Sequence, residues 1–324
     1  MERREIGRSG IEVTRIILGC GNFGGIGSSP AFFGQGTSHD DAIGLLDMAW
    51  ELGITTFDTA DAYGGGTSET WLGEWLATKG SAVRDQAVVT TKTFNPMSEG
   101  ADHGLSHARI LRQLETSLER LGVDRVALYM AHDHDPSTPQ EETLQAFDEL
   151  IRAGKVGAIG ASNYGAEEIA EALELAKLER LPRFEWAQNS FSLLDHGDRE
   201  TIFPLCREHG IGYTPFSPLA GGWLTGKYRR GQALPEGSRM TKRPEPYVGF
   251  TTDRVFDALE RLEARAGEHG VSMAALAIAW LLATPELTAV VVGPNSVAQF
   301  APVAESLDVK LSASEHQELA EWFA

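Results

Sequence analysis

The sequence predicts an α/β protein with one domain, a (β/α)8 TIM barrel that spans residues 1–324. A chain of 324 residues suits one such barrel, which typically has about 250 residues before insertions. Short apolar segments alternate with amphipathic segments along the chain, and such alternation favours a parallel sheet surrounded by helices. The apolar segments number eight, as a barrel requires: residues 15–20, 55–59, 87–91, 126–131, 156–162, 184–189, 211–215 and 289–293.

Three further segments extend this minimal barrel. Residues 4–7 and 11–16 flank Arg8-Ser9-Gly10, which predicts an N-terminal β-hairpin that caps one barrel end. Residues 219–250, after the seventh strand, form a long loop rich in Gly, Pro and Arg, and a loop of this length is usually functional or disordered. Residues 311–323 predict an extra C-terminal helix, because they begin with a capping-box pattern.

A doubly wound sheet is the alternative fold, and it usually carries a glycine fingerprint directly after its first strand. Gly19-Cys20-Gly21-Asn22-Phe23-Gly24 contains the first two of those glycines, but no helical pattern follows them. The barrel is therefore the favoured prediction.

Composition is that of an ordinary soluble globular protein, with 42% hydrophobic and 23% charged residues. No apolar run reaches the roughly 18 residues of a membrane-spanning helix, so no membrane association is expected. The first residues lack the apolar stretch of a secretory signal, and two cysteines, Cys20 and Cys206, cannot supply a disulfide framework. We therefore expect a cytoplasmic protein.

The formal charge of −18 argues against a nucleic-acid partner, because no global positive field collects phosphates. One basic segment interrupts this acidity after the seventh strand, where barrel enzymes often bind phosphate. It suggests a small bound polyanion, and a solvated surface loop is the alternative. Between residues 227 and 243 the only acid is Glu236, and the basic residues are Lys227, Arg229, Arg230, Arg239, Lys242 and Arg243.

Polar residues stand at the carboxyl ends of the predicted strands, and in a barrel these ends converge on one pocket. The first four are Asp58 and Tyr63 at the second strand, Lys92 at the third and His132 at the fourth. Together they suggest a proton donor for a carbonyl. A tyrosine has a pKa near 10, and a lysine ammonium would lower it. The aspartate would keep the lysine charged, and the histidine would hydrogen-bond the substrate oxygen.

The stretch His132-Asp133-His134-Asp135 also raises the possibility of a metal site. Neighbouring side chains at a strand end point to alternate faces, whereas a catalytic zinc site needs three convergent ligands. We therefore predict no metal.

Several of these stretches resemble the signature motifs of the aldo-keto reductase family, in the same order along nearly the whole chain. The pattern is similar to the bacterial and potassium-channel β-subunit-like branch. The matching stretches are residues 57–64, 91–92, 128–132, 160–163, 188–190, 216–219 and 224–228.

The resemblance implies an oxidoreductase acting on CH–OH donors, which reversibly reduces small-molecule aldehydes or ketones with NAD(P)H. It makes Tyr63 the general acid, tuned by Lys92, which pairs with Asp58, while His132 orients the carbonyl. It places Ser162, Asn163 and Gln188 at the nicotinamide carboxamide, with Phe216 stacked on the ring. The full set that it assigns to the cofactor is Gly21, Asn22, Ser162, Asn163, Gln188, Phe216, Ser217, Leu219, Gly221, Lys227, Gly293, Asn295 and Gln299.

The resemblance also implies a preference for NADP(H), with NAD(H) possible. Residues 293–299, just after the eighth strand, contain no Lys or Arg to meet a 2′-phosphate. The basic segment 227–243 could supply that contact, because Arg suits bidentate phosphate binding. We therefore expect NADP(H), with Arg229 and Arg230 contacting the 2′-phosphate.

Two other functions stay open at this point. A regulatory barrel that binds nicotinamide nucleotide with little turnover would use the same binding residues. A Schiff-base lyase would use Lys92 as its nucleophile. The sequence specifies neither the physiological substrate nor the oligomeric state.

Overall fold

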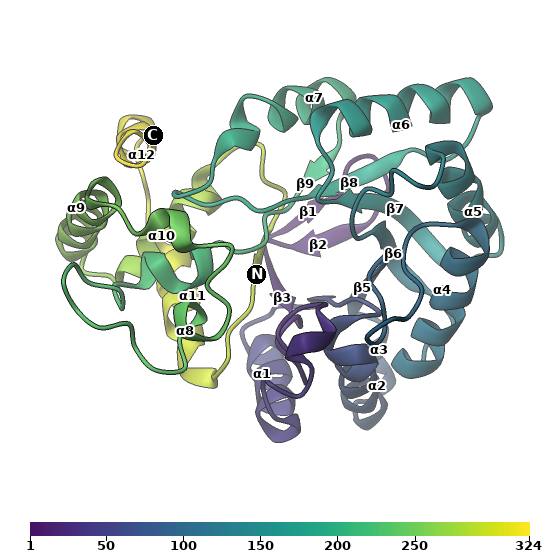
Figure 1. Cartoon of the computed structure of the whole chain (residues 1–324), viewed down its shortest axis with the longest axis horizontal. Helices are drawn as coiled ribbons and strands as arrows, with labels where there is room; N and C mark the ends of the chain where they lie inside the picture. The colour runs from purple at the N-terminus through teal and green to yellow at the C-terminus, as the bar shows by residue number, and fades with distance from the viewer.

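The computed structural model describes all of residues 1–324 and contains a parallel eight-stranded sheet with helices packed around it (Figure 1). The strand order is β10-β3-β4-β5-β6-β7-β8-β9. The two outer strands meet, because Thr288 N donates to Tyr213 O at 2.8 Å and Val291 N donates to Pro215 O at 3.0 Å. The predicted (β/α)8 barrel is confirmed, with strands β3 (Ile16–Gly19), β4 (Thr56–Asp58), β5 (Val88–Thr93), β6 (Val126–Ala131), β7 (Val156–Ser162), β8 (Phe184–Gln188), β9 (Gly212–Tyr213) and β10 (Val290–Val292).

One main helix follows each barrel strand and covers the outside of the sheet (Figure 1). These helices are α1 (His39–Glu51), α2 (Thr67–Thr78), α4 (His107–Leu121), α5 (Gln140–Arg152), α6 (Ala166–Glu179), α7 (Ile202–His209), α10 (Met273–Ala283) and α11 (Ala301–Asp308). The additional helices are α3 (Ser81–Arg84), α8 (Arg239–Lys242), α9 (Asp253–His269) and α12 (Ala313–Glu321). The 3-10 helices are η1 (Pro30–Phe32), η2 (Tyr63–Gly66), η3 (Gly197–Arg199), η4 (Ala220–Thr225), η5 (Val248–Phe250) and η6 (Val297–Phe300).

The strands lie where the alternation predicted them, with small differences in length. β5 extends two residues beyond the predicted end, because Lys92 and Thr93 continue to pair with Met130 and Ala131 of β6. β9 is shorter than the predicted residues 211–215, since Pro215 has no backbone N–H to continue a ladder.

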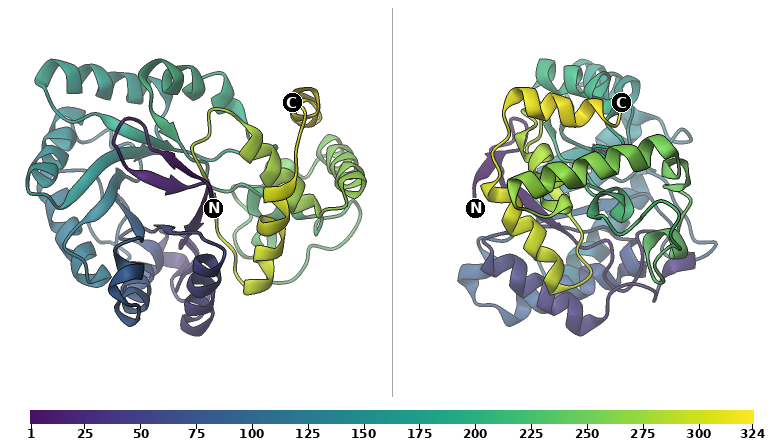
Figure 2. Two further views of the ribbon diagram at one scale, coloured as in Figure 1. Left: turned by 180° about the vertical axis from the view of Figure 1, so that it is seen from behind. Right: turned by 90° about the vertical axis from the view of Figure 1, so that its left-hand side faces the viewer.

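The N-terminal hairpin, β1 (Arg3–Glu5) and β2 (Glu12–Thr14), lies across the barrel end at which the strands begin (Figure 2). Ile6 and Val13 are fully buried and pack with the apolar side chains that fill the barrel interior, including Trp186. The hairpin turn approaches β8 closely. Gly7 has φ +58, and an added Cβ would lie 2.4 Å from Glu185 O, so this position requires glycine. The hairpin thus caps one barrel end, as predicted.

A buried arginine joins the first and last strands of the barrel. Arg15, directly before β3, is only 4% exposed. Its guanidinium donates to the carbonyl oxygens of Leu282 at 2.6 Å, Leu287 at 2.6 Å and Thr288 at 2.7 Å. Because these residues lie at the end of α10 and in the segment that leads into β10, the contacts fix the seam at which β10 pairs with β3.

The long loop and the extra C-terminal helix are both present. Residues 219–250 contain η4, α8 and η5 and run beside α9 (Figure 1). α12 begins after Ser312, whose Oγ accepts a hydrogen bond from Glu315 N at 3.2 Å. No single helix has both the length and the apolar composition of a membrane span; α9 and α10 reach these values only jointly, as a pair bent by 88°.

Candidate active site

The carboxyl ends of all eight strands open into one cleft, with a volume of about 1460 Å³. Ordinary small-molecule pockets have roughly 300–1,000 Å³, so the cleft has room for a dinucleotide and a substrate. Its walls include a residue at or just after every strand: Gly19, Asp58, Asn95, His132, Ser162, Gln188, Phe216 and Gly293. All the residues that the resemblance assigns to the cofactor also line it, namely Gly21, Asn22, Ser162, Asn163, Gln188, Phe216, Ser217, Leu219, Gly221, Lys227, Gly293, Asn295 and Gln299.

A buried ion pair lies beneath the floor of the cleft. Lys92 Nζ of β5 is 2.6 Å from Asp58 Oδ2 of β4 and also donates to Thr59 O at 3.0 Å. The second carboxylate oxygen of Asp58 accepts from Thr90 Oγ1 at 2.7 Å. Burial by itself would lower the pKa of Lys92, but Asp58 and the neighbouring Tyr63 together raise it. Lys92 is therefore held as an ammonium ion away from solvent.

Tyr63 stands above this pair, in the turn after β4. Its Oη lies 3.3 Å from Lys92 Nζ, which donates to it. Burial of the hydroxyl raises the pKa of Tyr63 above its ordinary value. The Lys92 ammonium lowers it, as expected, but does not offset the effect of burial. The phenol consequently remains protonated at neutral pH and has a proton to give.

His132 follows β6 and completes the group. Its Nε2 lies 3.4 Å from Tyr63 Oη, and the two rings meet edge to face with centroids 5.3 Å apart. Its backbone is held at both ends, since His132 N donates to Thr93 O at 2.9 Å and Asn163 Nδ2 donates to His132 O at 2.8 Å. Burial, with a smaller effect of Lys92, lowers the pKa of His132 well below its usual value, so the imidazole is neutral.

The residues after His132 have separate roles and do not converge. His134 packs edge to face against Tyr164, with ring centroids 5.3 Å apart. Asp135 accepts a hydrogen bond from Leu105 N at 2.7 Å and thereby anchors a neighbouring loop. No group of three His, Cys, Asp or Glu side chains in the structure could hold a metal ion together.

The floor of the cleft next to Tyr63 carries amide and hydroxyl groups. Ser162 and Gln188 are almost fully buried, and Gln188 Nε2 faces Asp58 Oδ1 at 3.5 Å. Asn163 adopts a positive φ of 58°, and its side-chain amide nitrogen donates a hydrogen bond to His132 O. Half-buried Phe216 borders the same space. Hydrogen-bonding groups of both kinds beside an aromatic ring fit the carboxamide and the ring of a nicotinamide.

Beyond Phe216 the backbone curls around the cleft in a run of positive φ angles. Ser217 has φ 55° and Ala220 has φ 47°, and Gly221 and Gly222 follow with 64° and 95°. A Cβ on Gly222 would lie 2.3 Å from Lys227 Nζ, so the absence of a side chain lets that ammonium approach the backbone. Backbone turned in this way, with a lysine beside it, is suited to an anionic group such as a pyrophosphate.

Two arginines of the long loop reach across to the loop after β3. Arg239 Nη2 donates to Asn22 Oδ1 at 3.1 Å, and Asn22 Nδ2 donates in turn to Gly293 O at 3.3 Å. Arg243 Nη1 donates to Ile26 O at 3.3 Å. The basic residues that line the cleft are therefore Lys227, Arg239, Lys242 and Arg243.

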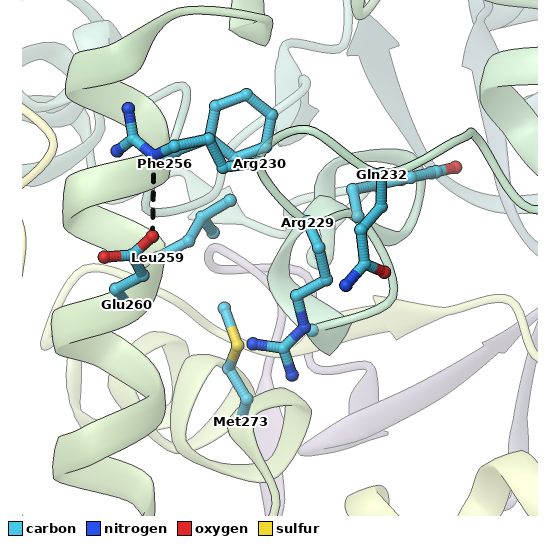
Figure 3. Close-up of a pocket in the computed structure, with 9 residues that line it drawn as sticks. Arg229, Arg230, Gln232, Phe256, Leu259, Glu260 and Met273 are labelled. Atoms are coloured by element: carbon cyan, nitrogen blue, oxygen red, sulfur yellow. Dashed lines mark ion pairs between the residues drawn. The ribbon is translucent and has the colours of Figure 1, made fainter.

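Arg229 and Arg230 lie elsewhere, which corrects their assignment to a cofactor phosphate. Figure 3 shows both side chains beside α9, around a separate pocket of about 220 Å³. Arg229 Nη2 donates to Glu263 at 2.6 Å, while Arg230 pairs with Asp257 and, at 3.6 Å, with Glu260. The acids of α9 that pair with these two arginines stand at helical spacing along one face of the helix.

A buried charge network behind β5 was not predicted from the sequence. Thr91 and Thr93 flank Lys92 and donate to Glu69 at 2.6 Å and to Asp61 at 2.7 Å. Burial raises the pKa of both carboxyl groups. These hydrogen bonds brace the strand that carries Lys92. The available signal was the presence of acids close to apolar strands in residues 57–72.

Asn95, three residues after Lys92, was also missed. Its Nδ2 lies 3.3 Å from His132 Nδ1. No motif marks it, and only its place at a strand end could have drawn attention to it.

Comparison with known proteins agrees with this geometry. The model of the aldo/keto reductase family matches residues 15–323. The uncharacterized oxidoreductase YrpG of Bacillus subtilis is 34% identical over 96% of this chain and 92% of its own length. A putative voltage-gated potassium channel subunit beta of Schizosaccharomyces pombe is 34% identical over 94% and 88% of the two chains. The L-glyceraldehyde 3-phosphate reductase of Escherichia coli O157:H7 is 32% identical over 95% and 88%. These matches support carbonyl reduction in general terms, and the chain belongs to the aldo/keto reductase family.

Proposed function

We propose that the protein reduces aldehydes or ketones to alcohols with NADPH, and that Tyr63 supplies the proton. The main support is the position of Tyr63 Oη at the cleft floor, 3.3 Å from Lys92 Nζ and 3.4 Å from His132 Nε2. When bound, the nicotinamide would supply a hydride to the carbonyl carbon.

The cleft residues would hold the dinucleotide in three groups. Ser162, Asn163 and Gln188 would bind its carboxamide, and Phe216 would stack on its ring. The turn that contains Ser217 would meet the pyrophosphate, together with Leu219, Gly221 and Lys227. Gly21 and Asn22 would border it from the other side, and Gly293, Asn295 and Gln299 would meet the adenosine.

Proton transfer follows from the charges around Tyr63. Its hydroxyl is protonated at neutral pH, so the proton can pass to the carbonyl oxygen as the carbon is reduced. The phenolate that remains is stabilised by the Lys92 ammonium, which Asp58 keeps charged. Neutral His132 hydrogen-bonds the carbonyl oxygen of the substrate and thereby orients it. General acid catalysis of this kind contributes about 10²–10⁴-fold to a rate.

Replacing Tyr63 by Phe tests the proposal. Turnover of butanal, followed by the loss of NADPH absorbance, should fall at least about 10²-fold, because the proton donor is gone. Affinity for NADPH, measured by quenching of protein fluorescence, should stay unchanged. Near-normal turnover of folded Tyr63→Phe would contradict the role of Tyr63.

The preference for NADPH over NADH is supported by the basic residues that line the cleft. Hydrogen bonds through Asn22 connect Arg239 with Gly293 on the proposed adenosine side. Lys242 lies on the same short helix as Arg239. Arg239→Ala with Lys242→Ala should therefore weaken NADPH binding more than NADH binding, and NADPH affinity should fall as salt rises.

The matched control for this test is Arg229→Ala with Arg230→Ala. These arginines are paired with α9 outside the cleft, so their removal should leave both affinities unchanged. Equal losses of NADPH and NADH affinity in the Arg239, Lys242 variant, or a wild-type preference for NADH, would overturn the proposed preference.

A regulatory barrel with little turnover is the second candidate, because several similar proteins are named as potassium channel β subunits. Measurable multiple turnover of simple aldehydes would exclude it. The Schiff-base lyase is disfavoured, since the Lys92 side chain is fully buried and its ammonium is paired with Asp58. Covalent trapping of a substrate on Lys92 by borohydride would support the Schiff-base lyase instead.

A further inference from the structure

The imidazole of His132 contacts two side chains, one at each ring nitrogen. Nε2 faces Tyr63 Oη at 3.4 Å, and Nδ1 faces the amide nitrogen of Asn95 at 3.3 Å. An amide nitrogen can only donate a hydrogen bond. With the amide in this orientation, Nδ1 is the accepting, unprotonated nitrogen of the ring.

We propose that Asn95 is a positioning residue that holds neutral His132 in the tautomer with its proton on Nε2. A neutral imidazole carries a single N–H, so the contact made at one nitrogen fixes the role of the other. Burial and the nearby Lys92 ammonium both lower the pKa of His132 and thereby keep the ring neutral. Since the ring is neutral, the choice of tautomer decides whether Nε2 donates or accepts.

That choice affects the proton of Tyr63, and in this respect the inference rests on the proposed function. With its proton on Nε2, His132 donates toward the cleft and toward the phenol oxygen. The Tyr63 hydroxyl hydrogen is then free to point at a substrate oxygen. In the other tautomer Nε2 would accept, and it would compete with the substrate for the Tyr63 hydrogen. Asn95 thus keeps the proton donor available.

The place of Asn95 is fixed by a buried arginine of α4. Arg109 is 2% exposed, and its Nη2 donates to Asn95 O at 2.7 Å. Its Nη1 donates to Thr93 Oγ1 at 2.7 Å, and Asp61 lies 3.9 Å from the guanidinium. One rigid group therefore holds the end of β5 and the backbone of Asn95. This anchoring sets the direction from which the Asn95 amide approaches His132.

Nitrogen-15 NMR of protein labelled on its histidine side chains tests the tautomer directly, without cofactor or substrate. Protonated and unprotonated ring nitrogens have distinct chemical shifts, and His132→Gln identifies the signal among the nine histidines. We expect Nε2 to be protonated and Nδ1 unprotonated in the wild type. In Asn95→Asp the carboxylate accepts from the ring, so Nδ1 should become protonated.

Two further variants make this comparison sharp. Asn95→Leu keeps the size of the side chain without a donor, and it should give a mixture of both tautomers. Gln86→Glu makes the same amide-to-acid change at an exposed residue in the turn after α3, and it should leave His132 unchanged. A protonated Nδ1 in the wild type, or a His132 spectrum unaltered by Asn95→Asp, would overturn the inference.

Kinetics then test the effect on proton transfer. In Asn95→Asp the kcat for butanal should fall by about 10²-fold, as expected when a catalytic imidazole takes the wrong tautomer or loses its place. The affinity for NADPH should be unchanged. A changed tautomer with normal kcat would overturn the positioning role. A wild type that turns over no carbonyl compound would refute the proposed function, while NMR would still decide the tautomer.

Discussion

The Asp58–Lys92 pair allows a quantitative prediction for Asp58→Asn. Lys92 Nζ lies 2.6 Å from Asp58 Oδ2, and the two side chains are 0% and 3% exposed, so solvent screens the pair very little. At an effective dielectric constant of about 20, a contact of that length is worth roughly 6 kcal/mol of attraction. Removing one partner leaves a buried charge without compensation. We expect the free energy of unfolding to fall by about 3–5 kcal/mol.

Urea unfolding followed by tryptophan fluorescence measures this loss. Lys92→Met should lower the free energy of unfolding by a similar amount, because it leaves the buried carboxylate of Asp58 without a partner. The double variant, Asp58→Asn with Lys92→Met, should recover most of the combined loss, since neither charge is then left alone. A coupling free energy near zero in this double-mutant cycle would refute the reasoning.

The pair also predicts a pH dependence. The folded protein raises the pKa of Lys92 above its ordinary value of 10.5, so the folded state binds this proton more tightly than the unfolded state. The resulting stability is fully present below pH 10.5 and is lost as pH rises through the folded pKa. In Asp58→Asn the carboxylate is absent, so burial has the main effect on Lys92 and lowers its pKa. The stability difference between wild type and Asp58→Asn should therefore begin to narrow below pH 10.5, where the buried lysine of the variant loses its proton. It should narrow further above pH 10.5, as the wild-type Lys92 loses its proton.

Three other substitutions probe the cofactor site and the packing. Phe216→Ala should weaken NADPH binding by about 1–3 kcal/mol in fluorescence titrations, and unchanged affinity in a folded variant would exclude ring stacking. Gly73→Ala places a Cβ 2.2 Å from a backbone oxygen of α4 and should lower the free energy of unfolding by about 1–3 kcal/mol, whereas Gly80→Ala, with open space, should be neutral. Thr93→Val removes the hydroxyl that donates to Asp61 and should lower the free energy of unfolding in urea by about 1–3 kcal/mol. Thr93→Ser keeps the hydroxyl and should retain that stability.

The barrel could be predicted from the sequence because its strands are short apolar runs separated by amphipathic helices. The bounds of Val126–Ala131 and Val156–Ser162 match the prediction at both ends. β5 is longer than predicted because Lys92 and Thr93 are polar yet paired within the sheet. Hydrophobic pattern alone ends a strand where polar residues begin, even when buried partners let the strand continue.

The meeting of Tyr63, Lys92 and His132 was also predictable, because strand ends converge in any barrel. The assignment of Arg229 and Arg230 failed for a different reason. A run of basic residues does not reveal which side of a loop faces a helix, and the acids that bind these arginines come later in the chain. Asn95 was missed because a single amide has no sequence signature until its partner is known.

The seam between β10 and β3 determines when the barrel can close during synthesis on the ribosome. β3 is complete at Gly19, but its partner strand ends at Val292. At about 5–20 residues per second, roughly 14–55 s separate the two events. Throughout that interval one edge of β3 has unpaired backbone groups, and such an edge can pair with another nascent chain. Translation pauses late in the message would lengthen this exposure, whereas pauses after β10 has emerged would not.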